Sequence, residues 1–214
     1  MAQQNVLPDP NHGRAADGEE SSSSANLGPG FKSVKLTSRQ KVMRSTTNSG
    51  RLLQRFHGYH KWEVNITYNS LTKDEFKEVY AFLLERRTTL APFFVQLPQY
   101  RGQSSTSTIV DQGPIAAGST TITLEPGDGA NCAVGDLFTI TDSNNSNHLK
   151  AYKITKVSTD TITITPPLSK AVTDGSTIVL VDPLIKVVQK GEVQEYSLNN
   201  NNLYKFSLNL EEVQ

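Results

Sequence analysis

The sequence predicts a mainly β protein in which one α-helix packs on a split β-sheet, with a small β-barrel or sandwich domain inserted. One segment, 72–87, carries a full set of helix signals, and segments near both ends of the chain alternate apolar and polar residues. The middle of the chain contains short Thr- and Ile-rich runs separated by Gly–Asp turns. We therefore expect a flexible tail over 1–30, a split β domain over 31–102 and 185–214, and an inserted β domain over 103–184.

The tail includes the stretch DGEESSSSANLGPG and has no apolar periodicity. Segments rich in Ser, Gly and acids cannot bury enough apolar surface to offset the entropy lost on ordering. We expect the tail to be disordered in the absence of a partner.

Four strands are expected next, over 31–36, 40–46, 51–56 and 61–68. The alternation is clearest in the last of these, where one set of side chains is apolar: Trp62, Val64, Ile66 and Tyr68. Such a period of two predicts a strand with one buried face.

The start of the helix is specified by a capping box, Thr72 with Glu75. Leu71 precedes the cap and Phe76 follows it at the spacing of a hydrophobic staple, which fixes the direction in which the chain enters the helix.

The helix has one apolar face, and its end is marked by cations and a proline. Arg86 and Arg87 are expected to oppose the negative end of the helix dipole, and Pro92 makes a longer helix unfavourable. The expected core positions of the helix are Phe76, Val79, Tyr80 and Leu83, with Leu84 on the same face.

Shorter strands follow the helix. Residues 93–97 form a short apolar run between two prolines. Five strands of the inserted domain are expected in STTITL, GDLFTIT, AYKITKVS, DTITITPPL and STIVLV. After Pro183, the segments IKVVQKGEV, EYSL and YKFSLNLEEV are expected to complete the sheet begun by residues 31–68.

Charge is balanced overall but unevenly distributed. The chain has 21 basic and 21 acidic residues, yet residues 31–62 contain cations and no acid, whereas the inserted domain is acidic. The basic segment, with Phe56 and Tyr59, could follow a nucleic-acid backbone. We favour docking on an acidic protein surface, because the alternation points Trp62 inward. The candidate subunit-interface residues are Lys41, Arg44, Arg51, Arg55 and Lys61.

Residues with reactive or metal-binding chemistry are sparse. His57 and His60 could supply two metal ligands, but the sequence places no third ligand nearby. Cys132 is the single cysteine and has no neighbouring histidine. Most acids of the inserted domain accompany Gly, Ser or Asn, as in turns. We expect no catalysis, no metal and no cofactor, and no apolar run is long enough to span a membrane.

The segment SGRLLQRFHGYHKWEVNITYNSLTKDEFKEVYAFLLERRTTLAPFFVQLP resembles the core of proteins that join the tail tube of long-tailed bacteriophages to its distal end. These are the distal tail, tube-initiator and baseplate-hub proteins. The shared features are a basic strand with GR, the strand KWEVNITY, a helix opening with LTKDEF, and the strand APFFVQLP. The terminal YKFSLNLEEV resembles their closing strand, and the inserted domain resembles small β modules on phage virions.

The resemblance implies a tail-tube-like fold in a structural virion protein without enzymatic activity. It would form a ring that joins the tail tube to the baseplate or tail tip, sixfold by family expectation and threefold as the alternative. Its partners would be copies of itself, the tube protein and baseplate or hub proteins, assembled in the host cytoplasm without a membrane. Two other functions stay open: a basic, sheet-bearing nucleic-acid binder, and a carbohydrate-binding module.

Overall fold

A computed structural model describes residues 5–8, 30–100, 108–142, 144, 148–191 and 195–213. The described residues form a mainly β fold with one α-helix and antiparallel sheets, which confirms the mainly β part of the predicted class. The chain forms two compact units: unit 1 holds Met1–Leu7, Phe93–Lys186 and Gln214, and unit 2 holds Pro8–Pro92 and Val187–Val213. The predicted boundaries of an inserted domain stay a prediction.

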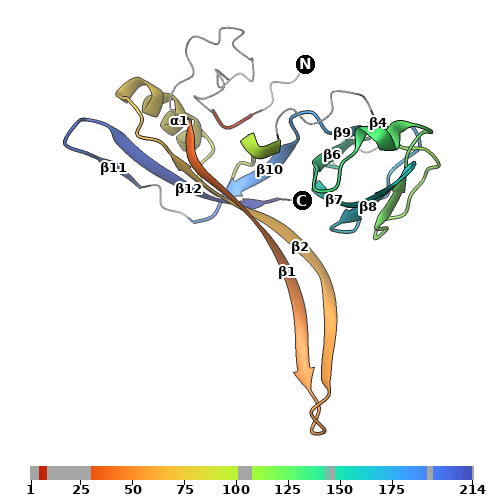
Figure 1. Cartoon of the computed structure of the whole chain (residues 1–214). Helices are drawn as coiled ribbons and strands as arrows, with labels where there is room; N and C mark the ends of the chain where they lie inside the picture. Colours follow the sequence, from red (N-terminus) through yellow and green to blue (C-terminus); the bar gives the residue numbers. More distant parts are fainter. Residues whose placement is uncertain are drawn as a thin grey trace. The chain divides into compact units, whose positions relative to one another are not determined.

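Unit 2 is organised around two long antiparallel strands, β1 (Phe31–Thr46) and β2 (Leu52–Tyr68) (Figure 1). The expectation of four shorter strands was wrong. The polar residues between the predicted strands continue the ladder, and a register shift between Gln40 and Val42 absorbs extra residues of β2. A β-bulge of this kind bends and twists a strand pair without ending it.

The C-terminal strands extend this sheet. β12 (Tyr204–Glu212) pairs with β2 from Ser207↔Thr67 to Glu211↔Glu63, so the prediction that the C-terminal segment completes the sheet is confirmed. On its other edge, β12 pairs with β11 (Tyr196–Leu198) and with the end of β10 (Leu184–Gln189). The strand order runs β1-β2-β12-β10 and ends at β3 (Phe93–Gln96).

Helix α1 (Lys73–Glu85) begins as the sequence predicts, because the Glu75 carboxylate accepts a hydrogen bond of 2.7 Å from the Thr72 backbone N–H. The helix ends two residues before the predicted 87. Arg87 and Thr88 have φ angles of 50° and 57°, in the left-handed region that terminates helices. Arg86 is therefore the C-cap, and its guanidinium lies 5.2 Å from the Phe82 ring centre.

The buried face of α1 is rotated from the predicted one. Phe76, Val79 and Leu83 are buried, Tyr80 is half-buried, and Leu84 is 54% exposed. The expectation that Leu84 lies on the buried face was wrong, and Phe82 is buried instead. At about 100° per residue, Leu84 lies beyond Tyr80 on the side of the helix away from Phe82.

The second sheet belongs to unit 1 and has the order β4-β9-β6-β7-β8-β5. Its strands are β4 (Thr108–Ile109), β5 (Thr121–Thr123), β6 (Leu137–Thr141), β7 (Ala151–Ser158), β8 (Thr161–Thr165) and β9 (Thr177–Val179). Beyond the ends of β4 and β5, the N–H of Asp111 donates to the Thr123 carbonyl and the N–H of Glu125 donates to that of Ile109, both at 3.0 Å. The first and last strands of the order therefore meet, which leaves less open edge.

The core of unit 1 also contains a buried polar group, His148. Its Nε2 lies 2.8 Å from the Tyr152 hydroxyl, while Nδ1 is buried and has no hydrogen-bond partner among the described residues. Burial lowers the pKa of His148 below its usual 6.5; the Asp142 carboxylate opposes this shift and Lys170 adds to it. His148 is therefore held in its neutral form.

We predict that Phe76→Ala lowers the free energy of unfolding by about 3–5 kcal/mol, because it removes a buried ring and leaves a cavity. The Phe76 ring lies 4.3 Å from that of Tyr204 and 4.9 Å from that of Tyr196. Lys77→Ala is the control, since the exposed Lys77 pairs only at the surface with Asp74, and it should cost under about 0.5 kcal/mol. Equal, small losses in chemical denaturation would contradict this assignment of the core.

We predict that the wild-type chain loses thermal stability between about pH 7.5 and about pH 5.5 through His148. Because the pKa of His148 is lowered in the fold, the unfolded chain binds a proton more readily as the pH falls through about 6.5. In His148→Gln this part of the loss should vanish, and Tm should depend less on pH. An unchanged pH dependence in the variant would show that His148 does not supply it.

Candidate assembly surface

The distal part of the β1–β2 hairpin, residues 41–59, is named the arm. β12 pairs with β2 no further than Glu63, and beyond this point the described strands β1 and β2 pair only with each other. Figure 1 shows the hairpin extending past β11, β12 and α1 of its own unit. An isolated two-stranded ribbon is marginally stable in water, so the arm is the least supported part of the sheet.

Both faces of the arm carry exposed apolar side chains. Met43 is 57% exposed and Leu52 is 55% exposed, and Val42 and Leu53 are also exposed. Neighbouring residues of a strand point to opposite faces, so each adjacent pair places one apolar group on either face. Among the described residues of unit 2, no other strand or helix pairs with the arm, so both of its faces carry uncovered apolar groups.

The tip of the arm is nevertheless well ordered by local hydrogen bonds. The Thr47 N–H donates to the Arg51 carbonyl at 2.9 Å, and the Arg51 N–H donates to the Thr47 hydroxyl at 3.0 Å. Gly50 has a φ of 80°, which a residue with a side chain adopts only with strain. The turn is preorganised, and this reduces the entropy lost when a partner binds.

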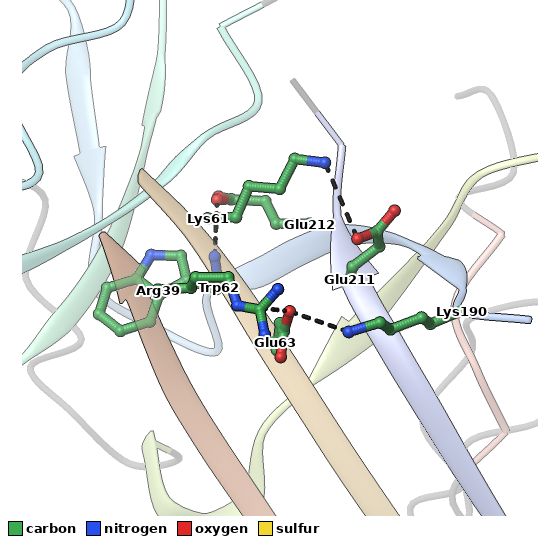
Figure 2. Close-up of polar contacts among 7 residues, drawn as sticks. All are labelled: Arg39, Lys61, Trp62, Glu63, Lys190, Glu211 and Glu212. Carbon is green, nitrogen blue, oxygen red and sulfur yellow. Dashed lines mark hydrogen bonds and ion pairs between the residues drawn. The ribbon is translucent and has the colours of Figure 1, made fainter. Parts of the chain in front are cut away.

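We name the segment 60–63 of β2, with Arg39 of β1, the root of the arm. An ion-pair network holds the root on the outer face of the sheet (Figure 2). The Glu63 carboxylate is 3.2 Å from the Arg39 guanidinium and 3.1 Å from the Lys190 ammonium. Glu63 lies directly opposite Glu211 in the register, and Lys61 is 3.8 Å from Glu211. The three cations offset the repulsion that two facing carboxylates would otherwise produce.

A buried contact supports the root on the inner face. The Glu212 carboxylate is fully buried and accepts a hydrogen bond of 3.2 Å from the Trp62 backbone N–H (Figure 2). Trp62 is itself buried, and its ring lies 4.6 Å from that of His60 in an edge-on arrangement. Where the pairing with β12 ends, β2 is thus attached to the last residue of that strand.

The structure separates the predicted interface residues into two groups. Lys41, Arg44, Arg51 and Arg55 are exposed on the arm, and no ion pair is found for them among the described residues. Lys61 lies at the root, half-buried and paired with Glu211. The sequence did not reveal this difference, because Glu211 is distant in the chain.

Sequence reasoning also missed the exposed apolar side chains of the arm. A signal was present in the adjacent pairs Val42–Met43 and Leu52–Leu53. A strand with one buried face places apolar residues at every second position, whereas an adjacent pair makes both faces apolar. In a ribbon without covering layers, this pattern indicates a surface that a partner covers.

The described side chains with reactive chemistry, those of His60 and Cys132, lie outside the arm. His60 is buried and its Nε2 lies 3.0 Å from the Ser38 hydroxyl, while the His57 side chain lies outside the described residues. Burial raises the pKa of the Cys132 thiol to about 11, helped by Asp136 and Asp128. The described part of the chain contains no group of three or more His, Cys, Asp or Glu that could hold a metal ion.

No described helix, α1 included, is long and apolar enough to cross a membrane.

Comparisons with known proteins place the arm in a matched region. Residues 21–100, which include β1, β2 and α1, match a family model described as the N-terminal part of the A domain of the distal tail protein pb9. The chain is 30% identical over 200 residues to the distal tail protein pb9 of Escherichia phage T5. The alignment spans 86% of this chain and 93% of that protein.

We predict that Glu212→Ala lowers the free energy of unfolding by about 1–3 kcal/mol, because the buried Trp62 N–H loses its carboxylate acceptor. Glu211→Ala is the matched control on the neighbouring residue. Glu211 is partly exposed and makes a long ion pair, so its removal should cost under about 1 kcal/mol. Urea denaturation of both variants measures this difference, and a loss as large in Glu211→Ala would contradict the inner-face contact.

Proposed function

We propose, from the premise that this chain belongs to the bacteriophage distal tail protein family, that it forms a ring joining the tail tube to the baseplate or tail tip. Family membership makes the chain a structural protein of the phage tail and a component of the virion. Ring formation, the position between tube and baseplate, and the neighbours are our proposal.

The observation that carries the proposal is the arm. It exposes four large apolar side chains, Val42, Met43, Leu52 and Leu53, on a ribbon supported only by its own two strands. Covering each of these half-exposed groups contributes on the order of 1 kcal/mol. A protein that functions as a monomer gains nothing from exposing them, whereas a subunit of an assembly uses them for contact.

The open edge of the sheet also supports a ring. Among the described strands, β1 pairs with β2 alone, so its other edge presents unpaired backbone groups along a strand of 16 residues. Native proteins protect such edges, and covering by another strand or segment is one of the means. A contact between two different surfaces of identical chains closes into a ring when the rotation permits. We propose sixfold symmetry, the family expectation, with threefold symmetry as the alternative.

The exposed cations of the arm fit a protein neighbour. Lys41, Arg44, Arg51 and Arg55 favour a surface that supplies carboxylates, and the residues 104–184 of a neighbouring copy contain eight acids and four lysines. The tube protein and the hub or baseplate proteins are the other proposed neighbours. Charges at the rim of an interface mainly set specificity and the association rate, while the apolar groups supply affinity.

The middle of the chain is proposed to be a separate module, residues 103–184, inserted in a tail-tube-like split domain. Its support is the second sheet, whose strands from β4 to β9 pair among themselves and whose end strands are joined by hydrogen bonds. In the proposed assembly the split domain supplies the ring and the module decorates it. Both roles require fixed geometry and no reactive group.

We predict that the double variant Arg51→Glu, Arg55→Glu fails to form rings with the tube and hub proteins of the same virion but keeps its fold. Both side chains are exposed, so the isolated chain should keep its circular dichroism and its Tm. Reversal of charge replaces attraction to carboxylates with repulsion. Negative-stain electron microscopy and sedimentation of the mixtures measure assembly.

The control for this double variant reverses two exposed lysines away from the arm, Lys156→Glu with Lys205→Glu. It has the same change of net charge and should still assemble. A wild-type chain that stays monomeric with its tube and hub proteins would refute the proposed ring. Tight, salt-dependent DNA binding that the arm variant abolishes would instead support a nucleic-acid binder.

A further inference from the structure

Unit 2 has a second exposed apolar surface, formed by α1 and β11. We name it the helix-side patch and define it as Tyr80, Leu84, Tyr196 and Leu198. Tyr196 is 51% exposed and Leu198 is 53% exposed, and Leu84 lies one helical turn beyond Tyr80. Most of the exposed large apolar side chains among the described residues belong to the arm or to this patch.

The patch is a rigid platform, because its aromatic rings are held around the buried Phe76. The Phe76 ring centre lies 5.2 Å from that of Tyr80 and 4.9 Å from that of Tyr196. The Tyr80 and Tyr196 rings meet edge-on at 5.5 Å, and Leu198 pairs with Tyr204 in the register. Tyrosines fixed in this way lose little conformational entropy on binding, which is one reason they are enriched in interfaces.

A strand edge borders the patch. Among the described strands, β11 pairs only with β12, so its outer edge is open next to the exposed side chains of Tyr196 and Leu198. The patch therefore combines apolar contact area and aromatic faces, which together suit a partner that carries apolar side chains and cations.

The arm carries apolar side chains and cations, which suit the helix-side patch. However, the arm cannot reach the patch of its own chain. The patch lies beyond the end of β2, where Leu71 forms a bridge with Tyr204, whereas the arm tip lies at the start of β2. The strand from Leu52 to Thr67 spans about 50 Å at about 3.3 Å per residue. Figure 1 shows α1 with β11 and the tip of the arm at opposite ends of the β1–β2 hairpin.

We propose that the arm of one copy docks on the helix-side patch of a second copy. The apolar side chains of the arm cover Leu84, Tyr196 and Leu198, and its arginines lie over tyrosine faces. The two surfaces differ, so the contact is head-to-tail and each chain offers one of each. This inference rests on the proposed ring and names the surface that receives the arm.

The test is a disulfide cross-link between two differently tagged batches of a Cys132→Ala chain. One batch carries Leu52→Cys or Leu53→Cys, which point to opposite faces of the arm, and the other carries Leu198→Cys. The batches are mixed, assembled with the tube and hub proteins of the virion, and mildly oxidised. We expect a mixed dimer whose yield is several-fold higher than with Ser197→Cys, the matched control on β11 that points to the opposite face.

The outcomes separate this inference from the proposed ring. Rings that form without a cross-link from either arm variant to Leu198→Cys, or with an equal yield from Ser197→Cys, would overturn the docking site and leave the ring intact. A wild-type chain that forms no ring would overturn the proposed function and this inference together. A preferred cross-link to Leu198→Cys supports both.

Discussion

The length of β2 is the constraint on which the rest of unit 2 depends, because this strand is longer than the sheet that supports it. Over Glu63–Thr67 it lies between β1 and β12, and its alternate side chains are buried. Over Leu52–Arg55 it has only β1 as a neighbour, and its side chains are exposed. The same strand is therefore a core element at one end and half of an exposed two-stranded ribbon at the other.

The contacts at the root of the arm lie between the buried and the exposed parts of β2. Glu212 binds the backbone of Trp62 on the inner face, while Glu63 joins cations of β1 and of the chain after β10 on the outer face. Surface ion pairs contribute little singly, but here they share one carboxylate across three segments. The helix packs through Phe76 on Tyr204 and Phe206 near the start of β12, whereas the root lies at the end of that strand.

The sequence predicted elements whose signals are local, and it missed features that depend on distant residues. The alternation around Trp62–Tyr68 and Tyr204–Leu210 predicted the strands of the sheet, and Thr72 with Glu75 predicted the start of α1. The continuous β1 and β2 were missed, because a polar break ends a strand only where no partner continues the ladder. The pairing of Lys61 and the exposure of Leu84 depend on Glu211 and on the helix orientation, which no local pattern specifies.

The central claim is that the arm is incomplete in the free chain and is covered in the assembled tail. Amide hydrogen exchange of the arm, with residues 62–68 as an internal reference, tests this claim most directly. Our account predicts fast exchange of the outward-facing β1 amides of the arm in the free chain and strong protection after assembly, while residues 62–68 are protected in both. Equal protection of the arm in the free and assembled states would contradict it.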